Sequence, residues 1–192
     1  MALKGKFDGK VMIEDELENN PGISRQALAA LHEAAFGWAL SLTRYDPQAA
    51  EDVMQQAYLS LVEGSARYDG AASLKTWLFA VIRNTARRHW RKQTQQAGLD
   101  ASLRAELDAQ ISATESQSAE AQLIQAPPAE LREAMRSLPN RQKQVLELVI
   151  DAEFTIEQVA TVLGISVGSV RTHYHRAKQS LRMTLETDYE SH

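Results

Sequence analysis

The segment from Thr155 to Ser166 restricts the fold more than any other part of this 192-residue chain. Thr155 and Gln158 have the spacing of a capping box, in which the threonine hydroxyl and the glutamine side chain each accept from the other residue's amide. Gly164 can take the left-handed conformation that ends a helix, and Ser166 can cap the helix that follows. The spacing therefore predicts a helix, a tight turn and a second helix.

The second of these helices has one apolar and one polar face. Its inward stripe is Val170, Tyr174, Ala177 and Leu181, at the spacing of one helix face. The outward face is polar and basic, and consists of Ser169, Thr172, His173 and Arg176, with Arg171 and His175 at its flanks. Such side chains bond base edges and phosphates when the second helix of a helix-turn-helix lies in the major groove. A structural three-helix domain with a solvated basic face is the alternative.

The rest of the chain also reads as helical. Nine glycines and five prolines are few for 192 residues, which favours long regular elements. Ser24, Asp46 with Pro47, and Ser73 are N-terminal caps of three predicted helices. Their apolar stripes are Leu28, Leu31, Ala35, Trp38 and Leu42; Ala50, Met54, Ala57, Tyr58 and Leu61; and Leu74, Trp77, Leu78, Val81 and Ile82. A three-helix bundle follows, and Pro139 opens a further helix with Val145, Leu146 and Val149 inward.

Charge is unevenly distributed along a chain whose net charge is −4. Basic residues gather at 83–92 and 171–182, whereas the N-terminal stretch and the middle segment are acidic. Either basic block alone could be a solvated helix face. In the first block, Trp77, Phe79 and Trp90 could stack on unpaired bases; we expect Trp77 in the core and Trp90 at the surface. Asn84 is either a reader of a base edge or an ordinary surface amide.

The middle of the chain, residues 95–129, has the composition of a linker. It is rich in Ala, Gln, Ser and Glu and ends in two prolines, a composition that does not fill a core. Leu99, Leu103, Leu107 and Ile111 recur every four residues there, so a short helix is expected, formed alone or against a partner.

Several classes of function are excluded or unsupported. The chain has no cysteine, which excludes disulfides, cysteine-ligated metals and thiol catalysis. His173 and His175 lie two positions apart on a helix and cannot chelate one metal together. No catalytic constellation is present, so we expect no enzyme activity and no cofactor. Without an apolar run long enough for a membrane span or a signal peptide, a cytoplasmic protein without membrane contact of its own is expected.

Two stretches of the sequence carry a family resemblance. Residues 50–59, AEDVMQQAYL, and 76–86, TWLFAVIRNTA, resemble region 2 of the extracytoplasmic function (ECF) sigma factors, which belong to the sigma-70 family of bacterial RNA polymerase. Ser137-Leu138-Pro139 with Gln142 and Val145, then residues 155–160 and 163–171, resemble region 4. The resemblance implies a protein that joins core polymerase and directs it to promoters, without catalysis of its own.

The resemblance also implies roles for individual residues. The helix carrying Asp52, Gln55, Gln56 and Leu59 matches the surface that docks on the β′ clamp helices, and region 4 rests on the β flap. Residues 67–73 match the loop that captures a flipped base of the minus-ten element. The implied minus-ten contacts are Tyr68, Asp69, Ser73, Trp77, Asn84, Arg87, Arg88 and Arg91. Those implied for the minus-thirty-five element are Ser166, Ser169, Arg171, Thr172, His173 and Arg176. Family members are commonly held inactive by an anti-sigma factor that covers both domains.

We therefore expect an all-α protein with two small helical domains joined by a flexible linker. The expected parts are an acidic extension at 1–23, region 2 at 24–94, a linker at 95–129, region 4 at 130–186 and a tail at 187–192. A conventional helix-turn-helix repressor or activator is an alternative, although it would need a dimerisation surface and palindromic sites. A sigma mimic that sequesters an anti-sigma factor is another, against which the retained arginines of both basic blocks argue.

Overall fold

All regular structure in the described part of the chain is helical. The computed structural model describes residues 20, 22–96, 134–135 and 137–189. Its helices are α1 (Arg25–Leu42), α2 (Pro47–Val62), α3 (Leu74–Gln96), α6 (Asn140–Ile150), α7 (Ile156–Leu163) and α8 (Val167–Tyr189). The predicted all-α fold is confirmed. Residues 1–19 of the predicted extension and 97–129 of the predicted linker, with the stripe from Leu99 to Ile111, lie outside the described residues.

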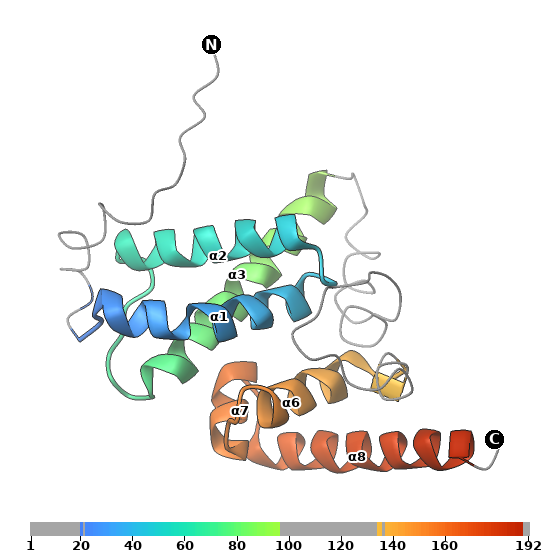
Figure 1. Cartoon of the computed structure of the whole chain (residues 1–192). Coiled ribbons are helices and arrows are strands. Elements are labelled where there is room, and N and C mark those ends of the chain that lie inside the picture. The colour runs from blue at the N-terminus through green and yellow to red at the C-terminus, as the bar shows by residue number, and fades with distance from the viewer. Residues whose placement is uncertain (1–19, 21, 97–133, 136, 190–192) are drawn as a thin grey trace.

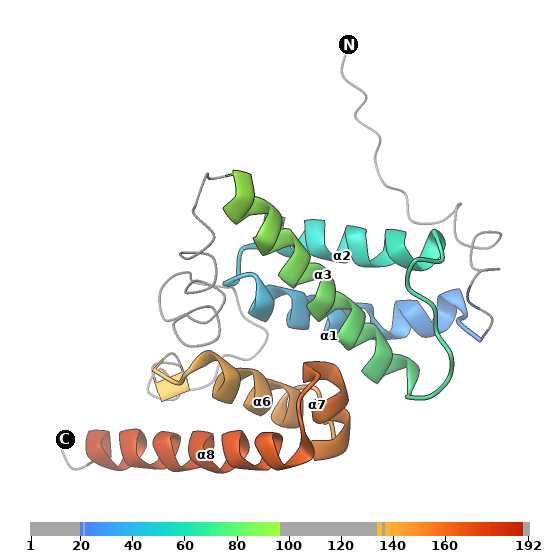
Figure 2. The ribbon, with the colours of Figure 1, turned by 180° about the vertical axis from the view of Figure 1, so that it is seen from behind.

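Helices α1 to α3 form the predicted three-helix bundle, and the predicted caps are present. The Ser24 hydroxyl accepts from the amide of Ala27, and the Asp46 carboxylate accepts from the amides of Gln48 and Ala49. Pro47 is the first residue of α2, where its missing N–H costs no hydrogen bond. Seen from behind, α3 lies obliquely across α1 and α2 (Figure 2). Their buried side chains, among them Trp38, Val53, Leu61 and Leu78, fill the core of the bundle.

Helices α7 and α8 form the predicted helix-turn-helix, and α6 precedes them as the predicted further helix. The Thr155 hydroxyl accepts from the amide of Gln158 at 3.2 Å, and the Gln158 side chain accepts from the amide of Thr155 at 2.9 Å. Gly164 ends α7 with φ of 60°, a left-handed conformation that glycine adopts without steric cost. The Ser166 hydroxyl then accepts from the amide of Ser169 and caps α8. Every local signal predicted for this turn is thus confirmed.

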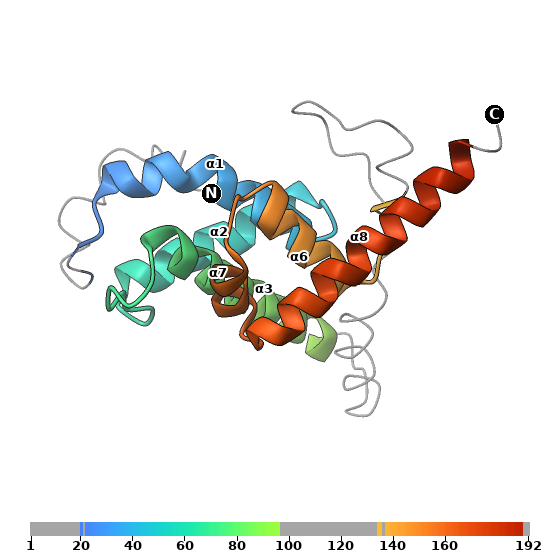
Figure 3. The ribbon, with the colours of Figure 1, turned by 90° about the horizontal axis from the view of Figure 1, so that it is seen from below.

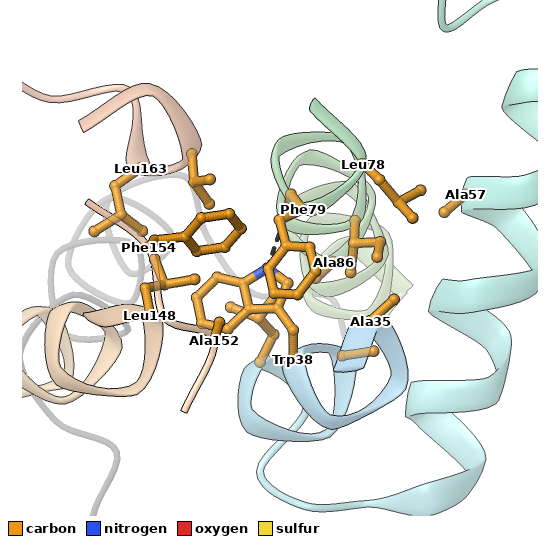
Figure 4. Close-up of a cluster of buried hydrophobic side chains, with 14 of the residues drawn as sticks. Ala35, Trp38, Ala57, Leu78, Phe79, Ala86, Leu148, Ala152, Phe154 and Leu163 are labelled. Carbon is orange, nitrogen blue, oxygen red and sulfur yellow. Dashed lines mark hydrogen bonds between the residues drawn. The ribbon is translucent and has the colours of Figure 1, made fainter. Parts of the chain in front are cut away.

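The two helical units pack directly against each other, which the sequence pattern did not predict. Helix α7 lies against α3, and α6 to α8 form a layer beneath the bundle (Figures 1 and 3). Phe79 of α3 meets Phe154, just before α7, with ring centroids 5.0 Å apart in an edge-to-face arrangement. Trp38 stacks on Phe79, and its indole N–H donates to the Phe79 carbonyl at 3.2 Å (Figure 4). One hydrophobic core therefore runs through both units.

Candidate nucleic-acid and polymerase interface

The helix that follows the Gly164 turn presents a polar and basic face. Arg171, Thr172 and Arg176 are exposed, and Ser169 is half-buried. Arg171 pairs loosely with Glu157 of α7 across 3.8 Å, where both side chains are largely solvated, so the ion pair adds little stability and leaves the guanidinium accessible. The Ser166 and Ser169 hydroxyls bond each other at 2.8 Å. The first turns of α8 thus offer accessible arginines next to serines engaged in capping.

His173 is half-buried, like Ser169, and it lies close enough to α6 for the charge of Arg141 to act on it. Burial, together with the charges of Arg141 and Arg176, lowers the pKa of His173 below its usual range. The ring is therefore neutral at pH 7 and offers one hydrogen-bond donor and one acceptor. One donor beside one acceptor suits a base edge, which presents both kinds of group, better than a phosphate, which only accepts.

Helix α3 carries the second cationic face. Asn84, Arg87, Arg88 and Arg91 are all exposed, in agreement with the predicted surface. Arg83, in contrast, is only 6% exposed. Burial, with the charges of Arg141 and Arg87, lowers its pKa to about 10, so Arg83 stays protonated at neutral pH.

Charges from the two units meet at one place, which we call the cationic seam: Arg83 and Arg87 of α3, Arg141 of α6, and His173 and Arg176 of α8. Arg141 lies near both units, since its charge acts on Arg83 of α3 and on His173 of α8, and Arg87 in turn acts on Arg141. The predicted minus-ten and minus-thirty-five residues are thus brought together at Arg87, His173 and Arg176. Like charges held together repel each other, and an anion between them would relieve that repulsion.

The loop of residues 67–73 has a defined shape before α3 begins. The Tyr68 hydroxyl donates to the carbonyl of Ala72 at 2.8 Å, and the Tyr68 ring lies 5.3 Å from that of Trp77. The Asp69 carboxylate accepts from the amide of Ala71, and the Ser73 hydroxyl accepts from the amide of Thr76. The side chains of Tyr68, Asp69 and Ser73 therefore form the loop's internal framework.

One expectation about the aromatic residues of α3 needs correction. Phe79 is 1% exposed in the core shared by the two units, so stacking of this ring on unpaired bases is excluded in this arrangement. Trp77 packs against the core as expected, but it is only half-buried there, and its ring also lies against that of Tyr68. Trp90 is partly accessible, as expected near a surface, but its indole N–H donates to the carbonyl of Leu42 and the Arg44 guanidinium lies over its ring.

The outer face of α2 is a separate surface. Gln55, Gln56 and Leu59 are exposed, and Asp52 is half-buried. Leu59 is 53% exposed, a large apolar side chain among polar neighbours. A polar rim around one apolar side chain is a common pattern at protein interfaces.

Neither a metal centre nor a membrane span is found in the described residues. No three His, Asp or Glu side chains of the described part gather where they could hold a metal ion. None of the described helices is both long and apolar enough to cross a bilayer.

Comparison with known proteins decides the family. Residues 28–96 match the family described as Sigma-70 region 2, and residues 129–181 match Sigma-70, region 4. The RNA polymerase sigma-E factor of Streptomyces antibioticus is 30% identical over 145 residues, covering 74% of this chain and 73% of the relative. The ECF RNA polymerase sigma factor EcfG of Rhodopseudomonas palustris (strain TIE-1) is 28% identical over 165 residues, 85% of this chain and 86% of the relative. This chain belongs to the ECF group of the sigma-70 family.

A solved structure supports the same fold for this sigma factor. The sigma factor RpoE from Bartonella quintana, determined in complex with the anti-sigma factor NepR, matches with a TM-score of 0.62 at 22% sequence identity. The match covers 85% of this chain and 96% of that one. Like other sigma factors, this protein is a transcription initiation factor and not an enzyme.

The sequence interpretation of this sigma factor missed the polar contacts between its two units. The Lys75 ammonium donates to the carbonyl of Ala152 at 2.6 Å and lies over the Phe154 ring. The Tyr45 hydroxyl donates to Glu147 at 3.2 Å, although 102 residues separate them. Burial raises the pKa of Glu147 to about 7, opposed by Lys143 and by the hydroxyls of Ser41 and Tyr45. With a lysine four positions before it, Glu147 has the pattern of a surface ion pair, so no local signal could have revealed its burial.

Proposed function

We propose that this sigma factor docks on core RNA polymerase through the outer face of α2 and reads promoter DNA through α3 and α8. In this proposal residues 24–94 form the unit that binds core polymerase and the minus-ten element. Residues 130–186 read the minus-thirty-five element, and residues 95–129 link the two. The observation that carries the proposal is the helix-turn-helix whose second helix begins with accessible Arg171 and Arg176, on a chain with a second arginine face on α3.

The minus-thirty-five assignment rests on the geometry of the turn. Gly164 and the Ser166 cap fix the angle at which α8 leaves α7, with its N-terminal turns facing outward. An arginine there can bond guanine or phosphate through two parallel hydrogen bonds. The neutral ring of His173 adds a donor and an acceptor, and Thr172 an exposed hydroxyl and methyl. The α8 N-terminus itself favours a phosphate beside Ser166.

The minus-ten assignment rests on the loop and the helix that it leads into. Capturing a base flipped out of the duplex costs a few kcal/mol of unstacking, so a loop shaped in advance is an advantage. Asn84, Arg87, Arg88 and Arg91 follow along α3, where their exposed side chains can hold the phosphates of an unpaired strand. The half-buried Trp77 lies beside Tyr68 at the base of the loop.

The arrangement of the two units has a consequence for promoter binding. Two elements about 25 base pairs apart lie roughly 85 Å apart along the duplex, at about 3.4 Å per base pair. Helix α8 is only about 35 Å long, at about 1.5 Å per residue, and α7 packs directly on α3. We infer that the two units separate when both elements are bound, which exposes Phe79 and Phe154.

A protein that binds the closed form would oppose this separation. The solved relative from Bartonella quintana is in complex with an anti-sigma factor, and on that basis we propose an anti-sigma partner for this chain. We also propose that the protein acts in the cytoplasm, where polymerase and promoter DNA are found.

Charge reversal in α8 tests the proposed function. The double variant Arg171→Glu/Arg176→Glu should co-elute with core polymerase like the wild type, because α2 is untouched. Run-off initiation from a cognate promoter should fall by about 100-fold, since each arginine contact with a base is worth roughly 1 to 3 kcal/mol. Lys178→Glu/Arg182→Glu is the matched control: it makes the same charge change on the same helix, beyond the first turns, and should cost less than about tenfold.

Three results would contradict the proposal. Unchanged initiation by the Arg171→Glu/Arg176→Glu variant would refute the DNA assignment of α8. Failure of the wild type to bind core polymerase, combined with binding to palindromic DNA, would favour a conventional regulator. Failure of both would favour a sigma mimic.

A further inference from the structure

Asn20, which precedes α1, is a buried polar residue bonded to a distant part of the chain. Its side chain is 1% exposed. The amide nitrogen donates to the carbonyl of Leu61 at 2.7 Å and to that of Ala66 at 3.1 Å, and the amide oxygen accepts from the backbone N–H of Tyr68 at 2.8 Å. Two carbonyl acceptors and one N–H donor fix which end of the amide is which. Asn20 therefore clamps the end of α2 to the start of the loop of residues 67–73.

The position of Asn20 is itself set by a tight turn. The backbone N–H of Ile23 donates to the carbonyl of Asn20 at 3.1 Å, and Gly22 adopts φ of 98°. Ile23 is buried in the core of the bundle, and Ser24 caps α1 directly after it. The turn is thus anchored at the start of α1, and it fixes the position of the Asn20 side chain.

The loop has no regular backbone pairing of its own. The turn after α2 ends with the amide of Ala66 donating to the carbonyl of Ser60 at 2.9 Å. From there to Ser73 the loop depends on side chains, with Asn20 at its start and the bonds of Tyr68 and Asp69 in its middle. Without Asn20, the Tyr68 N–H and the Ala66 carbonyl would lose this side-chain partner, whereas the Leu61 carbonyl would still accept from the Gly64 N–H at 3.3 Å. Polar groups left without a partner in a partly buried place favour rearrangement of the loop.

We propose that Asn20 is a positioning residue for minus-ten recognition, holding Tyr68 and the loop of residues 67–73 in the shape that receives the flipped base. The proposal rests on the proposed function of this loop. Asn20 itself touches no DNA; it acts through the backbone of Tyr68, whose ring and hydroxyl set the path to Ala72 and Trp77. The segment that precedes α1 thereby takes part in promoter choice.

The test compares full-length Asn20→Ala with Ser65→Ala. Ser65 lies in the same connection and donates to the carbonyl of Ser60 at 3.2 Å, so its substitution removes a hydrogen bond without touching Tyr68. Each variant is assayed for core co-elution, for binding to a minus-thirty-five duplex, and for initiation on a promoter set with single-base changes across the minus-ten element. The promoter is the one found by sequencing wild-type run-off transcripts.

Asn20→Ala should retain core and minus-thirty-five binding and lose about tenfold or more in initiation on the best promoter. Its preference among minus-ten bases should also flatten, a readout that a loss of stability alone would not move. Asn20→Asp keeps the acceptor for the Tyr68 N–H but sets a carboxylate oxygen against two carbonyls, so it should flatten the preference as Asn20→Ala does. Ser65→Ala should keep the wild-type profile.

Two other outcomes overturn the inference. An Asn20→Ala variant with the wild-type base profile shows that the clamp does not position the loop. Loss of core binding together with initiation shows that Asn20 supports the whole bundle instead. If wild-type protein fails to bind core polymerase or to initiate, the proposed function fails first, and this result is distinct from both.

Discussion

The α6–α8 unit and the α1–α3 bundle reach their functional shapes by different routes. In the former, the angle between α7 and α8 depends on residues close in sequence: the Thr155 capping box, Gly164 and the Ser166 cap. In the latter, the loop of residues 67–73 depends on Asn20, about 48 residues away. Local signals therefore suffice to build the turn between α7 and α8, whereas the loop of residues 67–73 needs the folded bundle around it.

The largest expected effect comes from removing an aromatic contact between the two units. Phe154→Ala should lower the free energy of unfolding by about 3 to 5 kcal/mol, because it leaves a cavity in the shared core beside Phe79 and Leu148. Urea unfolding measures the loss, and Phe36→Ala is the comparison, since Phe36 is only half-buried where it packs at the edge of the core and stacks on His32. Core binding through α2 should persist in Phe154→Ala. A loss in Phe154→Ala no larger than that in Phe36→Ala would contradict the view that Phe154 is a main contact of the shared core.

Glu147 gives the interface between the units a dependence on pH. Its pKa is raised from 4.5 to about 7 by burial, so the folded form holds a proton that the unfolded chain has already released. Stability should therefore fall as the pH rises from about 4.5 to 7 and then level off, by an amount on the order of 2 kcal/mol. The groups that face this carboxyl are Lys143, Tyr45, Ser41 and Asp151.

Glu147→Gln should flatten this profile, because a neutral amide can still accept from Tyr45. Relative to wild type, the variant should gain stability at pH 8 and differ little at pH 5. Thermal unfolding across that range tests this expectation. Parallel pH profiles for the two proteins would mean that Glu147 does not titrate at the interface.

The smallest effects should come from the turn between α7 and α8, and they should have opposite signs. Gly164→Ala places an L residue at φ of 60°, where no neighbour lies within 4 Å of the added carbon. The cost is then conformational, about 1 to 2 kcal/mol. Gly168→Ala, on the first turn of α8 with a neighbour no closer than 3.9 Å, should stabilise by up to about 1 kcal/mol. Urea unfolding measures both changes in the free energy of unfolding. Changes of the same sign in the two variants, or of the opposite signs to those expected, would contradict the local account of this turn.

Most of the helices could be predicted from the sequence, because each one carries its start signal in neighbouring residues. Ser24, Asp46, Ser73 and Thr155 all cap as expected, and the apolar stripes that follow them face the core. The residues of the candidate DNA surfaces also follow from periodicity, since an exposed arginine on an amphipathic helix is placed by its register. The Arg171 and Arg87 faces are examples.

The contacts between the units could not be predicted, because nothing local distinguishes them. Phe79 has the appearance of a nucleic-acid platform beside arginines, and Glu147 of an exposed partner for Lys143. Asn20 lies in a polar stretch of the sequence, and no periodic pattern there predicts that its side chain is buried. Each of these residues is hydrogen-bonded in the folded protein to a partner at least 41 residues away in the sequence.

The central claim is that this chain directs promoter-specific initiation by core RNA polymerase. Its most direct test mixes the purified protein with sigma-free bacterial core, measures co-elution on gel filtration, and sequences run-off transcripts from fragmented DNA of the source genome. The account predicts co-elution and discrete start sites, each preceded by the same two sequence elements. Absence of core binding, or starts no more focused than those of core polymerase alone, would contradict it.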